Sequence, residues 1–424
     1  MQLQRVLRLG DGLAVVVGIM VGSGILRTPG IVAARLGRPG LTFLAWALGG
    51  ALAWIGAMVF AELSTRHPRA GGKYVFAAEA FGSRAAFTIG WIETGIYCAA
   101  IAAIAVVCGE YAALLGGAPA SWARALGAGF IVLVTGVNLA GVIVGRWSQD
   151  VVTVAKLLAL GGVVVAAAAL GRGAGWSAPL PAAPQGMAVF GAMAAAFIPV
   201  LWTYYGYPDV AKIAEEVVDP QRNLPRIYLA GIAIVTGLYL LLNAAFLHVL
   251  PLERIAGSPL VAGEVMQQLF GARGAALTAG LALLVVLACL NGNVFVTPRV
   301  VFGLARDGLA PPAFRRVRRG TPWTATLLVG ALALLLEVTG SFEWLLTLAI
   351  LLVLLTDGFM VLVLFRLRAR ERAASFRVPL YPVLPTLFLV AYAAAFVAAV
   401  VDQPKVAGIT VAALAATYAA ARRR

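Results

Sequence analysis

The sequence predicts an all-α integral membrane protein that forms one transmembrane domain over residues 1–424. Of the 424 residues, 62% are hydrophobic and 12% are charged, whereas soluble proteins average about 45–50% apolar and about 25% charged residues. Apolar runs long enough to cross a bilayer recur along the whole chain, and two of them are interrupted by glycine or proline. A chain this apolar cannot cover its surface with polar groups in water, so these observations exclude a soluble protein.

The apolar runs predict about twelve transmembrane helices, because each is roughly 17–25 residues long. The segments between them are short, and none has the length or composition of a separate soluble module. The predicted boundaries are 12–33, 40–65, 85–115, 126–145, 149–170, 187–213, 227–250, 272–304, 322–340, 343–365, 380–401 and 404–421, each to within several residues.

The basic residues predict the orientation of the chain. If the N-terminus is cytoplasmic and the spans alternate, cytoplasmic segments hold about three times as many lysines and arginines as external ones. This bias predicts a multi-pass protein of the cytoplasmic membrane with both termini in the cytoplasm. It also explains the net charge of +15 without nucleic acid, so we interpret the basic clusters as topology determinants and contacts to membrane lipids. The clusters include 315–319, 366–377 and 422–424.

The two interrupted spans are the most informative feature for function. One contains Gly22-Ser23-Gly24, and the other contains Gly206 and Pro208. Unwound backbone at membrane depth persists only where it is buried in protein or lines a cavity. Broken spans at corresponding places in two halves are typical of secondary transporters. We therefore expect a first repeat over about 12–170, a second over about 187–365, and appended helices over about 380–421.

The chemistry of a broken helix suggests what each interruption binds. Glycine lets the backbone leave helical geometry at little steric cost, and the amides that open the following half-helix suit an anion such as a carboxylate. Carbonyls of the second break, around Trp202-Thr203-Tyr204-Tyr205, suit an ammonium group. The alternative for the first break is a small-residue packing face. For the aromatic residues it is core packing or an interfacial belt.

Several polar residues inside the spans are further candidates. Lys156 lies within an apolar run, where a lysine is costly and a functional role is the default interpretation. Three interpretations remain open for Lys156: it exchanges a proton during transport, it serves as a fixed cation, or its side chain extends to the membrane interface. Glu93, Asn291 and Asn293 would line a pocket or make structural hydrogen bonds.

Other chemistry is not indicated. The three cysteines have no zinc-like spacing, and no phosphate-binding loop or catalytic triad occurs, so we expect neither a metal, a cofactor nor an enzyme.

Four motifs together resemble the amino acid–polyamine–organocation superfamily, and within it the bacterial members of the L-type amino acid transporter family. They are GSGILRTPG, the stretch FAELSTRHPRAGGKYVFAAEAFG, the run AEEVVDPQRNLPR, and NGNVFVTPRVVFGLARDGLAP. The resemblance covers nearly the whole chain.

The resemblance implies a leucine-transporter-type fold with a five-plus-five inverted repeat, in which the first and sixth helices are discontinuous. It implies sodium-independent exchange of neutral L-amino acids by alternating access. Gly22, Ser23 and Gly24 would bind the substrate carboxylate. Lys156 would occupy the place of a sodium site and link the two broken helices. The carbonyls of Ile19, Trp202, Thr203 and Tyr205 would receive the ammonium, and Trp202 would be the aromatic gate.

Two alternatives and two departures accompany the resemblance. The first alternative is a proton-coupled symporter in which Lys156 carries the proton. The second is a transporter of cationic amino acids or polyamines that uses Glu93 and Glu110. Tyr205 replaces the glycine or aspartate of many relatives, which changes the shape of the pocket. The loop near 116–125 lacks the cysteine by which eukaryotic members bind a heavy chain, so no disulfide-linked heavy chain is expected.

Overall fold

The chain is a bundle of helices with one two-stranded hairpin. The computed structural model describes residues 3–173, 176, 179–340, 342–370, 374–402 and 404–421. Parts of two predicted basic clusters lie outside the described residues, namely residue 372 and residues 422–424. The same holds for part of the proline-rich segment 175–186, which is predicted to be external. The first half contains α1 (Leu9–Met20), α2 (Gly24–Leu36), α3 (Pro39–Arg66), α4 (Lys73–Phe81), α5 (Ser83–Gly116), η1 (Ala120–Trp122), α6 (Ala123–Leu139) and α7 (Val142–Leu170).

The second half begins with another interrupted helix and ends with two peripheral helices. It contains α8 (Ala188–Thr203), the 3-10 helix η2 (Tyr207–Glu216), α9 (Pro220–Val249), α10 (Leu252–Gly257), α11 (Val261–Phe270), η3 (Gly271–Arg273), α12 (Gly274–Val296), α13 (Pro298–Arg306), η4 (Pro312–Arg315), β1 (Val317–Arg318), β2 (Thr321–Pro322), α14 (Trp323–Thr339), α15 (Phe342–Arg370), α16 (Val383–Asp402) and α17 (Pro404–Ala420).

Eleven of the twelve predicted spans correspond to a helix or an interrupted pair of helices, and the remaining one, 126–145, overlaps both α6 and α7. Among the described residues, nine helical segments are long and apolar enough to cross a membrane, or ten if α1 and α2 form one bent span. Helices α14 and α17 are apolar but have only 17 residues. The membrane-spanning all-α class is therefore confirmed, whereas the count of twelve and the inverted repeat remain predictions.

Three boundaries differ from the sequence prediction. The expected span 126–145 crosses a turn, because α6 ends at Leu139 and Gly141 adopts φ 137° before α7 begins. The loop near 66–84 contains the short helix α4, and 251–271 contains α10 and α11. These three helices are each ten residues or fewer, too short for a search based on membrane-spanning length.

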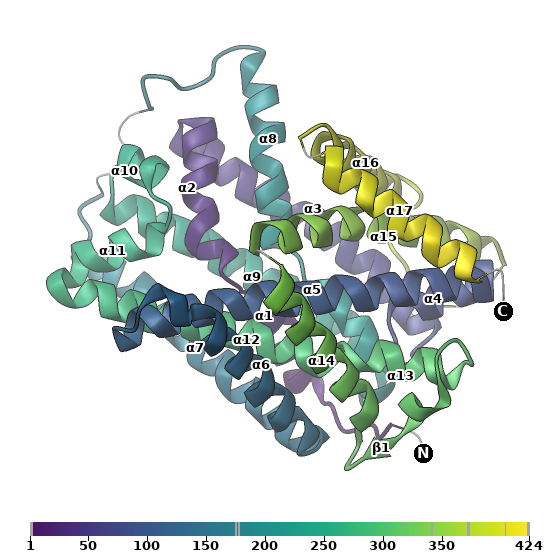
Figure 1. Ribbon diagram of the computed structural model, residues 1–424. Coiled ribbons are helices and arrows are strands. Elements are labelled where there is room, and N and C mark those ends of the chain that lie inside the picture. Colours follow the sequence, from purple (N-terminus) through teal and green to yellow (C-terminus); the bar gives the residue numbers. More distant parts are fainter. Residues whose placement is uncertain are drawn as a thin grey trace.

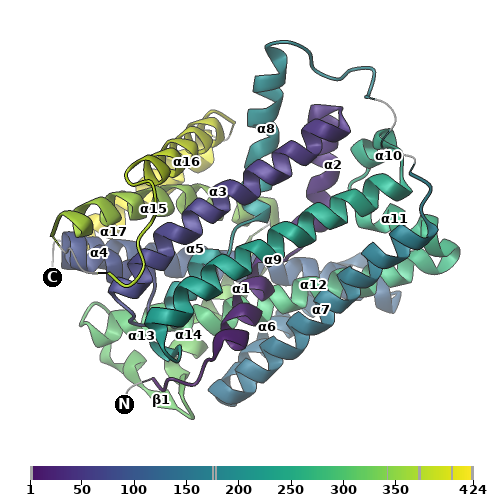
Figure 2. The ribbon, with the colours of Figure 1, turned by 180° about the vertical axis from the view of Figure 1, so that it is seen from behind.

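The arrangement places α1 and η2 inside the bundle, whereas α8 projects from it and is buried only toward its C-terminal end (Figures 1 and 2). Figures 1 and 2 show α1 at the centre, with α16 and α17 at one edge and α6 and α7 at the opposite edge. Helix α7 exposes Leu158 and Val165 at 71% and 68%, while Lys156 on the same helix is fully buried. An apolar outer surface over a polar interior is the pattern that a lipid environment favours.

Candidate functional site

The first interruption separates α1 from α2 at Val21-Gly22-Ser23, and the two helices are bent by 47°. The Gly22 N–H donates to the Met20 carbonyl over 2.9 Å, so this amide is already used. The first amides of a helix have no partner within it. Ser23 and Gly24, at the N-terminus of α2, are therefore the better placed donors for an anion, in part as the sequence predicts.

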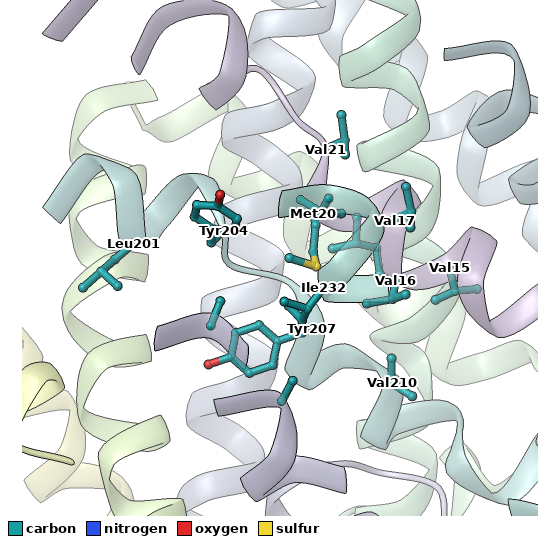
Figure 3. Packing of buried hydrophobic residues seen from close by; sticks show 14 of the residues in the cluster. Val15, Val16, Val17, Met20, Val21, Leu201, Tyr204, Tyr207, Val210 and Ile232 are labelled. Carbon is teal, nitrogen blue, oxygen red and sulfur yellow. The ribbon is translucent and has the colours of Figure 1, made fainter. Parts of the chain in front are cut away.

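The second interruption packs directly against the first. Gly206 has φ 131°, a conformation that side chains rarely adopt. A Cβ atom there would come within 3.0 Å of both Ile19 and Met20. Glycine at 206 is thus required both by backbone conformation and by the close approach of the two breaks. Figure 3 shows Met20 and Val21 together with Tyr204 and Tyr207, which share one buried apolar cluster.

Two side chains satisfy the carbonyls that the breaks leave free. Lys156 is completely buried, and its ammonium donates to the carbonyls of Gly18 and Val21 over 2.6 Å each. Both bonds go to the first broken segment. The Tyr239 hydroxyl lies 2.9 Å from the carbonyls of both Met20 and Thr203, and it donates its one proton to either. Tyr239, which the sequence analysis did not select, makes the link between the two breaks.

A cavity of 420 Å³ lies against the two breaks. This volume is within the range of about 300–1,000 Å³ that is usual for small-molecule sites. The cavity extends along α2 and α5 past Ile31 and Val107, toward the predicted external side. Every residue that the sequence predicts as substrate-binding lines it: Ile19, Gly22, Ser23, Gly24, Trp202, Thr203 and Tyr205.

Of the remaining candidates from the sequence, Asn293 lines the cavity, and Asn291, Glu93 and Glu110 do not. Asn293 lines the cavity and donates to the Cys289 carbonyl over 2.8 Å. Asn291 bonds to Gln149 and Asn138, which is the structural alternative. Glu93 is buried below the cavity lining, and Glu110 is exposed. Neither carboxylate lines the cavity.

The cavity wall also contains residues that were not predicted from the sequence, four of which are Arg27, Asp209, Tyr97 and Cys289. Arg27 lies about one turn after Gly24 in α2, so both residues are on the same face of the helix. Asp209 follows Gly206 by three residues, and Tyr97 and Cys289 come from α5 and α12. The helical period from each break gives the first two, but nothing in the sequence alone gives the other two.

The aromatic residues of the second break stack on one another. The rings of Trp202 and Tyr205 are 5.9 Å apart at an interplanar angle of 6°, and both line the cavity. The carbonyls of Ile19, Trp202 and Thr203 already accept bonds from Cys289, Tyr205 and Tyr239. A ligand ammonium would therefore share or replace these donors.

Three ion pairs lie on the predicted cytoplasmic side of the breaks, outside the lining of the cavity. Arg299 donates to both Glu216 carboxylate oxygens over 2.6 and 3.0 Å, and the pair is almost fully buried. Arg306 and Glu215 form a second pair over 2.6 Å, which is partly buried. Both glutamates lie at the end of η2, so η2 connects the second break to these ion pairs. Arg69 and Asp307 form a third pair over 2.8 Å.

Within the described residues, no group of three or more histidine, cysteine, aspartate or glutamate side chains is placed to hold a metal ion. The polar atoms around the cavity are backbone carbonyls, amides, hydroxyls and few charges. Such an arrangement suits the noncovalent binding of a small zwitterion.

Comparison with known proteins agrees with this geometry. The family model described as amino acid permease matches residues 11–419. The serine/threonine exchanger SteT of Bacillus subtilis is 29% identical over 388 residues, covering 88% of this chain and 86% of that protein. The mouse b(0,+)-type amino acid transporter 1 is 30% identical over 410 residues, covering 92% and 82%.

A further relative is the rat large neutral amino acids transporter small subunit 2, which is 29% identical over 420 residues, covering 96% of this chain and 78% of that protein. All these relatives are transporters and none is an enzyme. The match to the family model covers nearly the entire sequence, including both broken helices and the ion pairs below them. The chain therefore belongs to the amino acid permease family of membrane transporters.

Proposed function

We propose that this chain is a sodium-independent exchanger of neutral L-amino acids that works by alternating access. The observation that carries the proposal is the cavity between the two breaks, with helix-terminal amides on one wall and helix-terminal carbonyls on another. These two walls complement the carboxylate and ammonium that all amino acids share. The exchanger relative in Bacillus subtilis supports the mode of transport.

The proposed roles follow the positions of the residues. Ser23 and Gly24 bind the carboxylate, with Gly22 shaping the turn. The carbonyls of Ile19, Thr203 and Tyr205 receive the ammonium, together with that of Trp202, whose ring is the gate. Sodium independence is supported by Lys156, because its ammonium holds carbonyls of the first break that a bound cation would otherwise occupy.

The structure suggests which half of the cycle it represents. The cavity extends toward the predicted external side, and the ion pairs of Glu215 and Glu216 close the predicted cytoplasmic side. Alternating access would break these pairs and close the outer part of the cavity between α2 and α5. The five-plus-five repeat, headed by one broken helix in each half, is part of the same proposal.

We also propose that the chain works without a disulfide-linked heavy chain. All three of its cysteines are buried, and the turn between α5 and α6 contains none. The expected location is the cytoplasmic membrane, with both termini in the cytoplasm.

The test is counterflow in sodium-free proteoliposomes. Vesicles are loaded with unlabelled serine, alanine or leucine, and uptake of the same labelled amino acid is followed. We expect uptake only into loaded vesicles, unchanged by adding sodium. Uptake into empty vesicles that follows an imposed proton gradient would favour symport. Uptake of lysine or a polyamine in place of neutral amino acids would overturn the substrate class.

A further inference from the structure

Five ionisable side chains form a buried cluster directly below the cavity, outside the proposed substrate contacts. They come from four elements that are far apart in the sequence. Each side chain is at most 1% exposed, although the cluster lies within the membrane-spanning bundle. The members are Lys73 of α4, Glu93 of α5, Asp209 and Lys212 of η2, and Asp357 of α15.

Two ion pairs within the cluster account for four of the five groups. Lys73 Nζ is 2.5 Å from Asp357 Oδ1, and Lys212 Nζ is 2.7 Å from Asp209 Oδ1. Glu93 is left over, because its nearest cation, Lys212 Nζ, is 3.7 Å from Oε1. The other oxygen, Oε2, is buried and has no hydrogen-bond partner among the described residues.

The charges therefore do not balance if every group is ionised. Three carboxylates face two ammonium groups, which leaves one uncompensated negative charge among side chains that are at most 1% exposed. Burying an unpaired charge costs several kcal/mol, and the cost is greatest within a membrane. Among the described residues, the one cation within 4 Å of the Glu93 carboxylate is Lys212, which is already paired with Asp209.

Hydrogen bonds connect the cluster to the cavity wall. Lys73 Nζ donates to the Tyr205 hydroxyl over 3.1 Å, and the Tyr205 and Tyr97 hydroxyls are 3.3 Å apart. Lys212 Nζ lies 2.8 Å from the centre of the Tyr97 ring, a cation–π contact that favours the charged lysine. Since Tyr97, Tyr205 and Asp209 line the cavity, a change of charge in the cluster acts on the substrate site.

We propose that Glu93 binds one proton while the cytoplasmic end is closed, and that opening of that end releases it. The neutral carboxylic acid balances the cluster at zero net charge. When η2 moves with its ion pairs to Arg299 and Arg306, water reaches Glu93 from the predicted cytoplasmic side. The O–H bond then breaks, the proton passes to water, and the carboxylate is stabilised by hydration. This proton site rests on the proposed exchange function and is distinct from Lys156.

The groups that face Glu93 or its partners come from every element packed around the cluster. They set the pH range in which the proton of Glu93 dissociates. Those that do not belong to the five-residue cluster have hydroxyl or thiol side chains, which do not remove the charge imbalance. They are Lys73 from α4, Tyr97 and Cys98 from α5, Tyr205 from the second break, Tyr207, Asp209 and Lys212 from η2, Tyr228 from α9, Cys289 from α12, Thr356 and Asp357 from α15, and Tyr392 from α16.

The experiment is the pH profile of exchange. Purified protein in proteoliposomes exchanges labelled serine for internal serine, with the same pH on both sides, from mildly acidic to mildly alkaline conditions. Wild-type exchange is expected to fall with rising pH, at most about tenfold per pH unit, as one group titrates. E93Q, which is permanently neutral, should have a flat profile whatever its absolute rate.

Two further variants make the test specific. E110Q removes an exposed carboxylate from the same helix and should keep the wild-type profile. D209N leaves two carboxylates for two ammonium groups, so Glu93 gains Lys212 as its partner and the pH dependence should also disappear. If E93Q binds serine but does not transport it, the measurement becomes the rise in melting temperature that serine causes. This rise is followed as a function of pH in place of the exchange rate. If E93Q does not fold, D209N decides.

The outcomes separate this inference from the proposed function. No exchange of any neutral amino acid at any pH would reject the exchanger itself. Exchange with a flat wild-type profile, or an unchanged profile in E93Q or D209N, would overturn the proton site. The proton site would also be overturned if the wild-type profile is flat, the wild type transports lysine and D209N does not. In that case the cationic side chain of the substrate supplies the missing charge.

Discussion

Replacing Glu216 by glutamine should open the predicted cytoplasmic end. The substitution removes the charge that compensates Arg299 while keeping the size of the side chain. In the closed structure the pair is nearly inaccessible, with side chains 2% and 1% exposed. In an open state, water would solvate Arg299 and the loss would cost little. The substitution therefore destabilises the closed conformation selectively.

The magnitude follows from burial. Removing one partner of a buried ion pair costs about 3–5 kcal/mol, which corresponds to a change of about a hundredfold to several thousandfold in the equilibrium between conformations. Glutamine keeps one acceptor oxygen for the guanidinium, and Arg299 retains its bond to the Phe295 carbonyl. We therefore expect the lower end, about a hundredfold.

Cys289 provides the assay, because its thiol lies in the cavity wall while the other two cysteines do not. In a background with Cys98 and Cys108 replaced by alanine, a small membrane-impermeant thiol reagent is added to one side of oriented vesicles. E216Q should slow labelling from the external side and speed it from the cytoplasmic side.

A matched control is available on the opposite side of the membrane. Glu264 and Arg254 form a pair over 3.2 Å whose side chains are 29% and 47% exposed, and such surface pairs contribute about 0–1 kcal/mol. E264Q should leave labelling unchanged. If E216Q also labels like the wild type from both sides, the Glu216–Arg299 pair does not hold the cytoplasmic end closed.

Three further substitutions test the breaks through initial rates of counterflow. K156M should abolish most exchange in folded protein, because the Gly18 and Val21 carbonyls each lose a charged donor worth about 1.5–3 kcal/mol; wild-type rates would exclude this role. G24A should raise the KM, since a Cβ would come 2.8 Å from Thr203 Oγ1. G191A, where a Cβ meets nothing within 4 Å, is its control, and equal KM values would contradict the argument. Y239F should lower the melting temperature and the exchange rate by removing the donor between the breaks, at a cost of about 1–3 kcal/mol; a change confined to stability would make Tyr239 purely structural.

The features that could be predicted from the sequence are those that violate the rules of a membrane helix. Glycine at 22 and 24, proline at 208 and a lysine at 156 are exceptional in apolar runs, and each marks a real break or polar contact in the structure. The spans themselves follow from hydropathy and length. What fixes them is the cost of unsatisfied backbone groups in lipid, which acts on each span separately.

The features that could not be predicted depend on which helices become neighbours. Tyr239 is an ordinary aromatic residue of an apolar run, and its role exists only because Met20 and Thr203 end their helices beside it. The same holds for Lys73 and Asp357, which are far apart in the sequence but 2.5 Å apart in the fold. The short helices α4, α10 and α11 are a different case, because each is ten residues or fewer and cannot be recognised by membrane-spanning length.

The ten residues of η2 join three parts of the molecule that a transport cycle must coordinate. Its first residues follow Gly206 and include Asp209, both in the cavity wall, its middle carries Lys212 of the buried charge cluster, and its end carries the glutamates of the cytoplasmic pairs. A movement of η2 that is large enough to separate Glu216 from Arg299 also shifts Lys212 relative to Glu93. In the proposed cycle, the binding of substrate, the protonation of the cluster and the closure of the cytoplasmic end are coupled through this one short segment, and a variant that alters any one of them should alter the other two.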